Sequence, residues 1–366
     1  MRILQVDSGR EWRGGQNQVR LLCHQLIGRP ELENRLFTKK DGELARRARG
    51  DLVPTIQSPW TVGVSPTAFL CLGTAIRRYM PAIVHVHDSH SLTLALAVRR
   101  TLHWPFLGGR GISGKLVLDE EPTDFAIIAH RRVDFHVKPK SNWTRADRVI
   151  AVSDGVKQVL VSDGVNPRDV AVIPDGIDPE EVRANANRDP AIRKRLGLPL
   201  DVPLAVNAAA LVDHKDHETL IRAAARARAR VPQLHWVIAG EGPLRGALQR
   251  EIANLGVGDI VHLVGYVEPV DALIREASVF VMSSKEEGMG SVVLQALALS
   301  KPVVATAAGG LPEIVPPEWL VPVGDAETLA AKTLQALEHP TPIPLAARFT
   351  AKAMAEATLA QYRTLA

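Results

Sequence analysis

The sequence predicts an α/β protein built from two Rossmann-like, doubly wound domains, and three observations carry this prediction. Short apolar segments alternate with helix-like segments along the whole chain. The apolar segments are hydrophobic throughout rather than at every second position, which is typical of parallel strands buried on both faces. At roughly 100–200 residues per domain, a chain of 366 residues is long enough for two domains with separate cores.

The first half of the chain predicts one such domain. Strands are expected at residues 2–7, 83–87, 126–130, 149–152 and 170–173, and helices at residues 15–27, 66–79, 91–102 and 154–162. The first helix carries apolar residues at Val19, Leu22 and Leu26, which is the spacing of one buried face. Residues 105–125 combine glycines with an acidic cluster, and we expect a surface loop there.

Two prolines and a glycine interrupt the pattern at residues 174–182 and predict the start of a linker. The alternation then repeats, so the predicted domains are residues 1–175 and 176–344. In the second, strands are expected at residues 204–209, 235–239, 260–264, 279–282, 302–305 and 319–322, and helices at residues 218–230, 244–255, 269–276, 291–299 and 326–337. The alanine-rich segment at residues 345–366 predicts a last helix that packs back on the first domain.

Glycine-rich turns join predicted strands to predicted helices at three places, residues 12–18, 283–291 and 307–310. In open α/β sheets ligands bind beyond the carboxyl ends of the strands, so these turns are expected to line a site. Glycine lets the backbone approach a ligand closely, and the first N–H groups of the following helix are free to bind an anion. The helix that opens near Ser291 is expected to suit a diphosphate.

Residues 283–315, SSKEEGMGSVVLQALALSKPVVATAAGGLPEIV, resemble the signature of the family-4 (group 1) retaining glycosyltransferases, which have the GT-B fold. That signature has a Glu-Gly-aromatic-Gly turn and a second glutamate eight positions after the first. Further matches follow the family's order along nearly the whole chain, namely GGQ, HVHDSH, RRVDF, RADRVIAVSD, VIPDGID and VPVGD. The resemblance implies two domains facing across a cleft, the first binding the acceptor and the second the nucleotide-sugar donor.

The activity that the resemblance implies is retaining transfer of a hexosyl or related sugar from a nucleotide-diphosphate sugar. The acceptor would be a glycan, a lipid-linked molecule or a small molecule, and the expected setting is cell-envelope polysaccharide biosynthesis. Three alternatives stay open: a nucleotide-sugar epimerase or phosphorylase of the same architecture, a nucleotide-sugar-binding protein with a degenerate active site, and a two-lobed solute-binding protein. The absence of a recognisable signal peptide argues against the last.

The resemblance also implies roles for single residues. Glu287 matches the first motif glutamate, near the donor sugar, and His130 matches a histidine near the transferred sugar. Lys215 matches a lysine that binds the donor phosphates, so these three are the candidate catalytic residues. The candidate donor-binding residues match glycine-rich turns and the loop that meets the nucleobase; they are Gly15, Gly265, Tyr266, Val267, Gly288, Gly290, Ser291, Val292 and Gln295.

Two positions depart from the family pattern. Gln295 stands where the second motif glutamate grips the ribose hydroxyls, and Ala210 stands where an arginine usually precedes Lys215 by five residues. A glutamine can still accept one hydrogen bond and donate others, but it carries no charge. Both changes put donor affinity in doubt, and a glutamate restored at position 295 is expected to preserve donor binding or to tighten it.

Charge and composition limit the partners. Residues 1–175 hold 25 basic and 18 acidic residues, whereas the remainder holds 19 and 22. The basic first half fits an anionic lipid surface or a phosphorylated acceptor, or it is scattered solvated charge. We expect a cytoplasmic protein with at most weak peripheral attachment to the inner membrane face, no nucleic-acid partner and no cofactor. His85, His87 and His90 have a spacing that resembles a metal site, but the family is metal-independent and no metal is expected.

Overall fold

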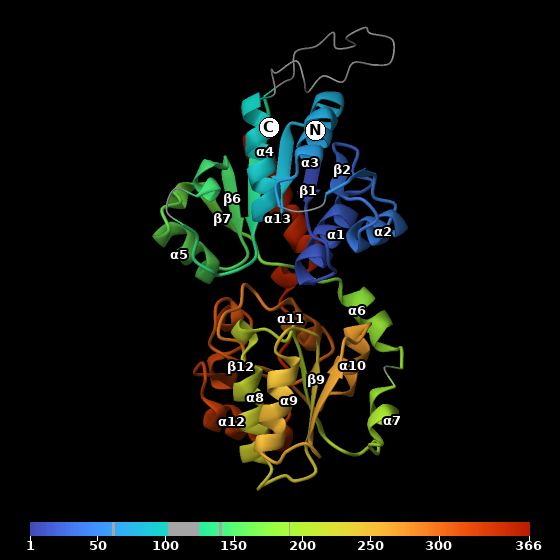
Figure 1. The fold of residues 1–366 in the computed structure, drawn as a ribbon, viewed down its shortest axis with the longest axis vertical. Coiled ribbons are helices and arrows are strands. Elements are labelled where there is room, and N and C mark those ends of the chain that lie inside the picture. The colour runs from blue at the N-terminus through green and yellow to red at the C-terminus, as the bar shows by residue number, and fades with distance from the viewer. Residues whose placement is uncertain (61–62, 102–123, 139–140, 190) are drawn as a thin grey trace. The chain divides into compact units, whose positions relative to one another are not determined.

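The computed structural model describes residues 1–60, 63–101, 124–138, 141–189 and 191–366. It divides into two compact units, one formed by Met1–Gly176 together with Ala351–Ala366 and the other by Ile177–Thr350 (Figure 1). Each unit is an α/β structure with one parallel sheet, which confirms the fold class expected from the sequence. The surface loop expected at residues 105–125 lies almost entirely outside the described residues.

The sheet of the first unit has the strand order β3-β2-β1-β4-β5-β6-β7. Its strands are β1 (Arg2–Asp7), β2 (Glu33–Lys39), β3 (Thr55–Ser58), β4 (Ile83–Val86), β5 (Ala126–Arg131), β6 (Arg148–Ala151) and β7 (Val170–Val172). The helices are α1 (Gly14–Leu26), α2 (Glu43–Gly50), α3 (Pro66–Tyr79), α4 (Ser89–Thr101) and α5 (Asp154–Ser162), followed at the end of the chain by α13 (Ala351–Leu365). The order reverses beside β1, so the carboxyl ends of β1 and β4 flank the switch point where such sheets bind ligands.

The sheet of the second unit has the order β10-β9-β8-β11-β12-β13, with its switch point between β8 and β11. Its strands are β8 (Leu204–Ala208), β9 (His235–Ala239), β10 (Val261–Gly265), β11 (Val279–Met282), β12 (Val303–Thr306) and β13 (Leu320–Val321). Its helices are α6 (Pro179–Ala186), α7 (Ile192–Leu196), α8 (His217–Ala227), α9 (Arg245–Asn254), α10 (Val270–Glu276), α11 (Ser291–Ala298) and α12 (Ala326–Glu338).

Local sequence explains where many helices begin. The Ser65 side chain accepts a hydrogen bond from the N–H of Ala68, and Pro66 occupies the first turn of α3. Ser153 caps α5 in the same way. Helix α11 differs because it follows a glycine and has no side-chain cap. Its first N–H groups are therefore available to a ligand.

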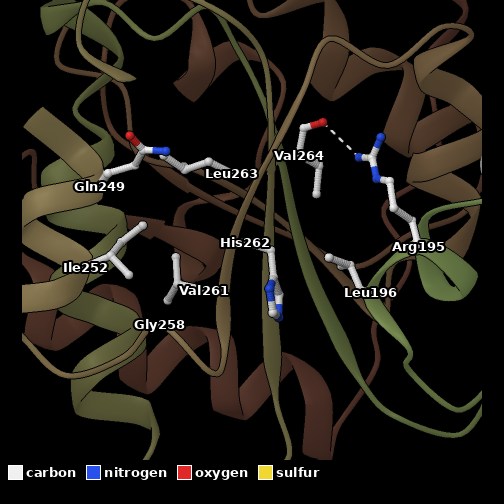
Figure 2. Close-up of a pocket in the computed structure, with 9 residues that line it drawn as sticks. All are labelled: Arg195, Leu196, Gln249, Ile252, Gly258, Val261, His262, Leu263 and Val264. Carbon is white, nitrogen blue, oxygen red and sulfur yellow. Dashed lines mark hydrogen bonds between the residues drawn. The ribbon is translucent and has the colours of Figure 1, made fainter. Parts of the chain in front are cut away.

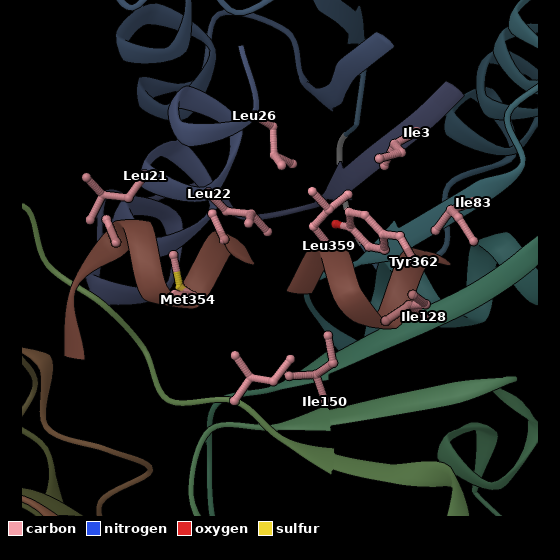
Figure 3. Close-up of a cluster of buried hydrophobic side chains, with 13 residues drawn as sticks. Ile3, Leu21, Leu22, Leu26, Ile83, Ile128, Ile150, Met354, Leu359 and Tyr362 are labelled. Carbon is pink, nitrogen blue, oxygen red and sulfur yellow. The ribbon is translucent and has the colours of Figure 1, made fainter. Parts of the chain in front are cut away.

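Helix α13 completes the core of the first unit although it ends the chain. Met354, Leu359 and Tyr362 are fully buried, and Figure 3 shows them pointing toward side chains of α1 and toward isoleucines of β1, β4, β5 and β6. The sequence expected a helix over residues 345–366; the helix itself begins at Ala351, and residues 177–350 form the second unit. The chain therefore returns to the first unit with its last sixteen residues.

Shortening one side chain of this helix is expected to destabilise the first unit. Leu359 is 0% exposed, and Leu359→Ala should lower the free energy of unfolding by about 2–5 kcal/mol through lost burial and the cavity left behind. Urea unfolding followed by circular dichroism measures this change. Lys352→Ala on the exposed face of the same helix is the control and should shift the midpoint little. Equal effects from both substitutions would show that α13 is not part of the core.

Candidate functional site

In the second unit, a glycine-rich turn leads into α11. Gly290 has a φ of 85°, and a Cβ at this position would lie 2.8 Å from Cδ2 of Leu311, so both the backbone conformation and the packing require glycine. Within the described residues, the N–H groups of Ser291 and Val292 donate no hydrogen bond. These two groups lie at the positive end of the helix dipole, where an anion is stabilised.

Lys215 and Glu287 form an ion pair beside this turn. Lys215 Nζ lies 2.5 Å from Glu287 Oε2, and the side chains are 17% and 12% exposed. Ser284 Oγ donates to the same carboxylate oxygen at 3.2 Å. The sequence resemblance implied that Lys215 binds the donor phosphates and that Glu287 lies near the donor sugar, but it did not predict an ion pair between them. The structure brings the two candidate catalytic residues of this unit together.

Backbone hydrogen bonds hold the segments that carry this pair. The N–H of Lys285 donates to the carbonyl of His214 at 2.8 Å, which joins the turn after β11 to the turn before α8. The N–H of Gly310 donates to the carbonyl of Glu287 at 2.9 Å, which joins the third glycine-rich turn to the second. Two of the three turns singled out in the sequence therefore meet at one place, at the carboxyl ends of β11 and β12.

Gln295 lies one turn into α11, where it contacts α10. Its Nε2 donates to Oδ1 of Asp271 at 2.7 Å, and Asn185 Nδ2 of α6 donates to the other carboxylate oxygen at 3.2 Å. Asp271 is 4% exposed. Burial, followed by the charge of Glu181, raises the pKa of Asp271 to about 6, while the two amide donors oppose the rise.

The loop expected to meet the nucleobase follows β10. Gly265 has a φ of 78° and its carbonyl accepts from the N–H of Gly240 at 2.8 Å. Tyr266 is 58% exposed. A Cβ on Gly240 would lie 1.9 Å from the carbonyl oxygen of Ala209, so the turn after β9 packs directly against the turn after β8. Sequence reasoning missed this turn, although its Gly-Glu-Gly spacing after a strand was a visible signal.

In the first unit, three histidines gather on one face of the sheet: His85 of β4, His87 just after β4, and His130 of β5. His85, His87 and His130 are buried, and the rings of His85 and His130 stack with centroids 5.4 Å apart. Arg132 donates to Nδ1 of His87 at 3.2 Å and to Nδ1 of His130 at 3.1 Å. Its Nε also donates to Asp175 Oδ1 at 3.0 Å, and both side chains of this pair are about 10% exposed.

The hydrogen bonds of this cluster set the position of each proton. Because a guanidinium only donates, Nδ1 of His87 is an acceptor and its Nε2 carries the hydrogen, which goes to Oε1 of Gln5 at 2.8 Å. Gln5 Nε2 then donates to the hydroxyl of Tyr362 at 3.0 Å, so that hydroxyl donates to Nδ1 of His85 at 2.7 Å. Burial is the main cause that holds the pKa of each imidazole in the cluster well below its usual value.

The same argument gives His130 an Nε2–H group that can donate to a ligand. Arg132 occupies its Nδ1, so its hydrogen lies on Nε2, a buried atom for which the described residues offer no partner. His85 Nε2 is in the same position. The cluster has the close spacing of a metal site, but every Nδ1 lone pair receives a proton donor and the remaining nitrogens carry hydrogen. His90, which the sequence grouped with His85 and His87, is exposed and outside the cluster.

Two family models match the chain. The model described as Glycosyl transferases group 1 matches residues 188–355, and the model described as Glycosyltransferase Family 4 matches residues 12–181. Together they cover nearly all of both units. The chain belongs to the group 1 glycosyltransferases.

Relatives with similar sequences align with part of this glycosyltransferase chain. The lipopolysaccharide core biosynthesis glycosyltransferase LpsE of Rhizobium meliloti is 32% identical over 147 residues, 38% of this chain and 40% of that protein. The putative colanic acid biosynthesis glycosyltransferase WcaL of Salmonella typhimurium is 28% identical over 229 residues, 58% of this chain and 54% of that protein. The matches thus span between two fifths and just over half of the length of these curated relatives.

Solved structures match along the whole glycosyltransferase chain. Anabaena Alr3699/HepE in complex with UDP and glucose has a TM-score of 0.74 at 18% identity, covering 100% of this chain and 97% of that one. A glycosyltransferase from Rickettsia africae has a TM-score of 0.77 at 19% identity, covering 100% and 98%. These likenesses confirm the GT-B fold that the sequence resemblance implied.

In the first unit of the glycosyltransferase, Gly15 lies at the start of α1 and Asp7 at the end of β1. A Cβ built on Gly15 would meet no heavy atom of the described chain within 4 Å, so internal packing gives no reason for glycine there. Asp7, at the end of β1, is 1% exposed and was missed from the sequence. Burial, and then the nearby charge of Asp88, raises the pKa of Asp7 to about 7. An acidic residue at a strand end beside a glycine-rich turn was the available signal.

The glycosyltransferase also has hollows away from α11. One of about 350 Å³ follows the edge strand β10 and is lined by Arg195, Leu196, Gln249, Ile252, Gly258, Val261, His262, Leu263 and Val264 (Figure 2). Arg195 donates to the carbonyl of Val264 at 2.8 Å and so covers a free edge of the sheet. None of the candidate catalytic residues lines this hollow, and we do not assign the site to it.

Proposed function

We propose that this chain transfers a sugar from a nucleotide-diphosphate sugar to an acceptor hydroxyl with retention of configuration. The observation that carries the proposal is the meeting of the free N–H groups of Ser291 and Val292 with the Lys215–Glu287 pair in the second unit. Fixed N–H dipoles and a cation suit a diphosphate, and the carboxylate suits the positive charge that develops at the anomeric carbon. The donor-binding role of residues 177–350 rests on this arrangement.

The proposed chemistry needs no covalent nucleophile from the protein. The bond from the anomeric carbon to the diphosphate lengthens first. The acceptor hydroxyl then attacks the same face of an oxocarbenium-like centre and passes its proton to the leaving phosphate oxygen. Lys215 and the start of α11 stabilise the leaving diphosphate, and Glu287 stabilises the sugar. His130 contributes from the first unit by donating its Nε2 hydrogen to the transferred sugar, because Arg132 holds it in that tautomer. We propose that no metal ion takes part.

The acceptor side is assigned to the first unit. A hollow of about 650 Å³ lies beside the start of α4 and the segment after β5 and includes Arg131, Lys138, Phe135 and Trp143. Basic and aromatic side chains together suit an anionic or glycosylated acceptor. In the described part of the chain no helix has the length and hydrophobicity to span a membrane. For the cytoplasmic protein that we infer, any association with anionic lipid would be peripheral and reversible by salt.

The donor class and the pathway that we propose follow those named for similar proteins. The solved Anabaena structures hold UDP with glucose, or UDP-glucose, which supports a uridine-diphosphate sugar as the first donor to try. The names of the relatives LpsE and WcaL refer to lipopolysaccharide core and colanic acid biosynthesis. We therefore propose a glycan or lipid-linked acceptor of a cell-envelope polysaccharide.

Release of nucleoside diphosphate from UDP-, GDP-, ADP- and dTDP-sugars tests this function, with and without glycan and lipid-linked acceptors. We expect acceptor-dependent release with one donor, an α-linked product from an α-linked donor, and no loss of rate in EDTA. Interconversion of the sugar without transfer would favour an epimerase. Binding of a donor without turnover under any condition would favour the degenerate binding protein and overturn the transferase.

A further inference from the structure

Asp271 controls which end of the Gln295 amide is free. Gln295 Nε2 donates to Asp271 Oδ1 at 2.7 Å, so the amino end of the side chain is occupied. Among the described residues, no donor reaches Gln295 Oε1. A carboxylate accepts and cannot donate while ionised, so the amide cannot be turned with its oxygen toward Asp271 without placing two acceptors together. Oε1 is thus the end presented away from α10.

Asp271 is itself held by neutral donors only. Its second oxygen accepts from Asn185 Nδ2 at 3.2 Å, and the carboxylate is 4% exposed. No salt bridge to Asp271 is present within the described ranges, and the charge of Glu181, which raises the pKa of Asp271, has the same sign. Its negative charge therefore acts on the Gln295 amide rather than being cancelled by a cation. Hydrogen bonds in such surroundings polarise one another, which makes Oε1 a stronger acceptor.

We propose that Asp271 is a positioning residue that presents Oε1 of Gln295 as the acceptor for a ribose hydroxyl of the donor nucleotide. The inference rests on the proposed function, in which Gln295 meets the ribose. A glutamate at position 295 would supply an acceptor and a charge in one side chain. Here the acceptor lies at position 295 and the charge lies one hydrogen bond behind it, at position 271.

This arrangement reverses the effect that the sequence alone predicts for Gln295→Glu. The substitution places a second carboxylate where the amide nitrogen now lies, 2.7 Å from Asp271 Oδ1. Two carboxylates at that distance cannot both be ionised and solvated by the site as it stands, so one rotates away or takes up a proton. We expect weaker donor binding from Gln295→Glu alone, and recovery when Asp271→Asn is added, because the amide then donates to the new carboxylate.

Calorimetry with UDP and 2′,3′-dideoxy-UDP measures how much the ribose hydroxyls contribute to nucleotide binding in each variant. The ratio of the two dissociation constants cancels general effects of a substitution on folding, and thermal unfolding checks that each variant is folded. In the wild type we expect UDP to bind about three- to tenfold more tightly, the size of a neutral hydrogen bond. Gln295→Leu, Asp271→Leu and Gln295→Glu should each bring the ratio close to one, because Asp271→Leu removes the acceptor of the Gln295 amide, and D271N/Q295E should restore it.

The decisive comparison is Asp271→Leu in the wild type and in Gln295→Leu. If Asp271 acts through Gln295, the substitution at position 271 lowers the ratio in the wild type and leaves the ratio unchanged in Gln295→Leu. Asn185→Ala is the matched control for a purely structural role, in which these hydrogen bonds only hold α6, α10 and α11 together. It should lower thermal stability but leave the ratio of dissociation constants nearly at its wild-type value. A ratio that survives Asp271→Leu, or a wild-type ratio of one, overturns the inference alone. A wild type that binds no UDP, GDP, ADP or dTDP overturns the proposed function with it.

Discussion

Glu287→Gln is expected to lower the rate of transfer by about two orders of magnitude while changing donor affinity only a few-fold. Glu287 carries the negative charge nearest the anomeric carbon in the proposed complex. The neutral amide of a glutamine at this position cannot stabilise a developing positive centre. Its partner Lys215, 2.5 Å away, is freed from the ion pair and turns its full charge to the diphosphate. Ground-state binding is thereby kept while stabilisation of the transition state is lost.

Lys215→Ala should differ from Glu287→Gln because it weakens donor binding as well as slowing transfer. It removes a cation from the diphosphate and leaves the carboxylate of Glu287, 12% exposed, beside the remaining negative charge of the donor. Both changes weaken donor binding, and a charge-assisted contact is worth about 1.5–3 kcal/mol, or roughly ten- to a hundredfold. The two members of one ion pair are thus distinguished by donor affinity, which should fall in Lys215→Ala and stay nearly unchanged in Glu287→Gln.

Initial rates at saturating donor and acceptor, together with calorimetric donor affinity, measure both quantities. Glu286→Gln is the matched control because it removes the same charge from the adjacent, exposed position, and it should leave the rate within about twofold. Unchanged turnover in Glu287→Gln would remove Glu287 from the reacting centre. Equal losses of turnover from Glu286→Gln and Glu287→Gln would show that the effect is general to this turn.

Local patterns in the sequence predicted most of the fold. The strands whose residues are apolar throughout, such as Val279–Met282, fall where the sequence placed them. Strand β2 was missed because Arg35 and Lys39 interrupt its hydrophobic run, and β3 was missed because Thr55–Ser58 is short and largely polar. Helices α2, α6 and α7 are short, and a periodicity of 3.6 residues is hard to detect over five to eight positions.

The site was predictable where its residues belong to one turn. Gly290 and Ser291 became candidates because a strand, a glycine-rich turn and a helix follow one another in the chain. The Lys215–Glu287 pair joins residues 72 positions apart, and the hydrogen bond from Tyr362 to His85 joins residues 277 positions apart. Hydrophobic periodicity says which face of an element is buried, but not which side chains from distant elements meet there. Gln295 is an example, because the expected effect of Gln295→Glu on donor binding reverses once its hydrogen bond to Asp271 is known.

Arg132→Met is expected to destabilise the first unit strongly. The side chains of Arg132 and Asp175 are 10% and 9% exposed, and removing one member of a buried ion pair typically costs about 3–5 kcal/mol. Asp175→Asn/Arg132→Met should cost less than the sum of the single substitutions, because no charge is then left without its partner. Chemical unfolding of the four proteins gives the coupling energy. A coupling energy near zero would mean that the pair contributes only through its separate contacts.

The same substitution is expected to change the protonation of the histidine cluster. Arg132 donates to Nδ1 of His87 and His130, so the wild type should show the Nε2–H form of both rings in long-range ¹H–¹⁵N spectra. Repulsion from Arg132 also contributes to the low pKa of His130, after burial, so in Arg132→Met that pKa should rise toward its usual value. The exposed His90 is the internal reference and should not change. If His130 keeps the Nε2–H form and transfer proceeds at the wild-type rate in a folded Arg132→Met protein, the guanidinium does not set the tautomer. His130 would then have to be positioned by the sheet alone.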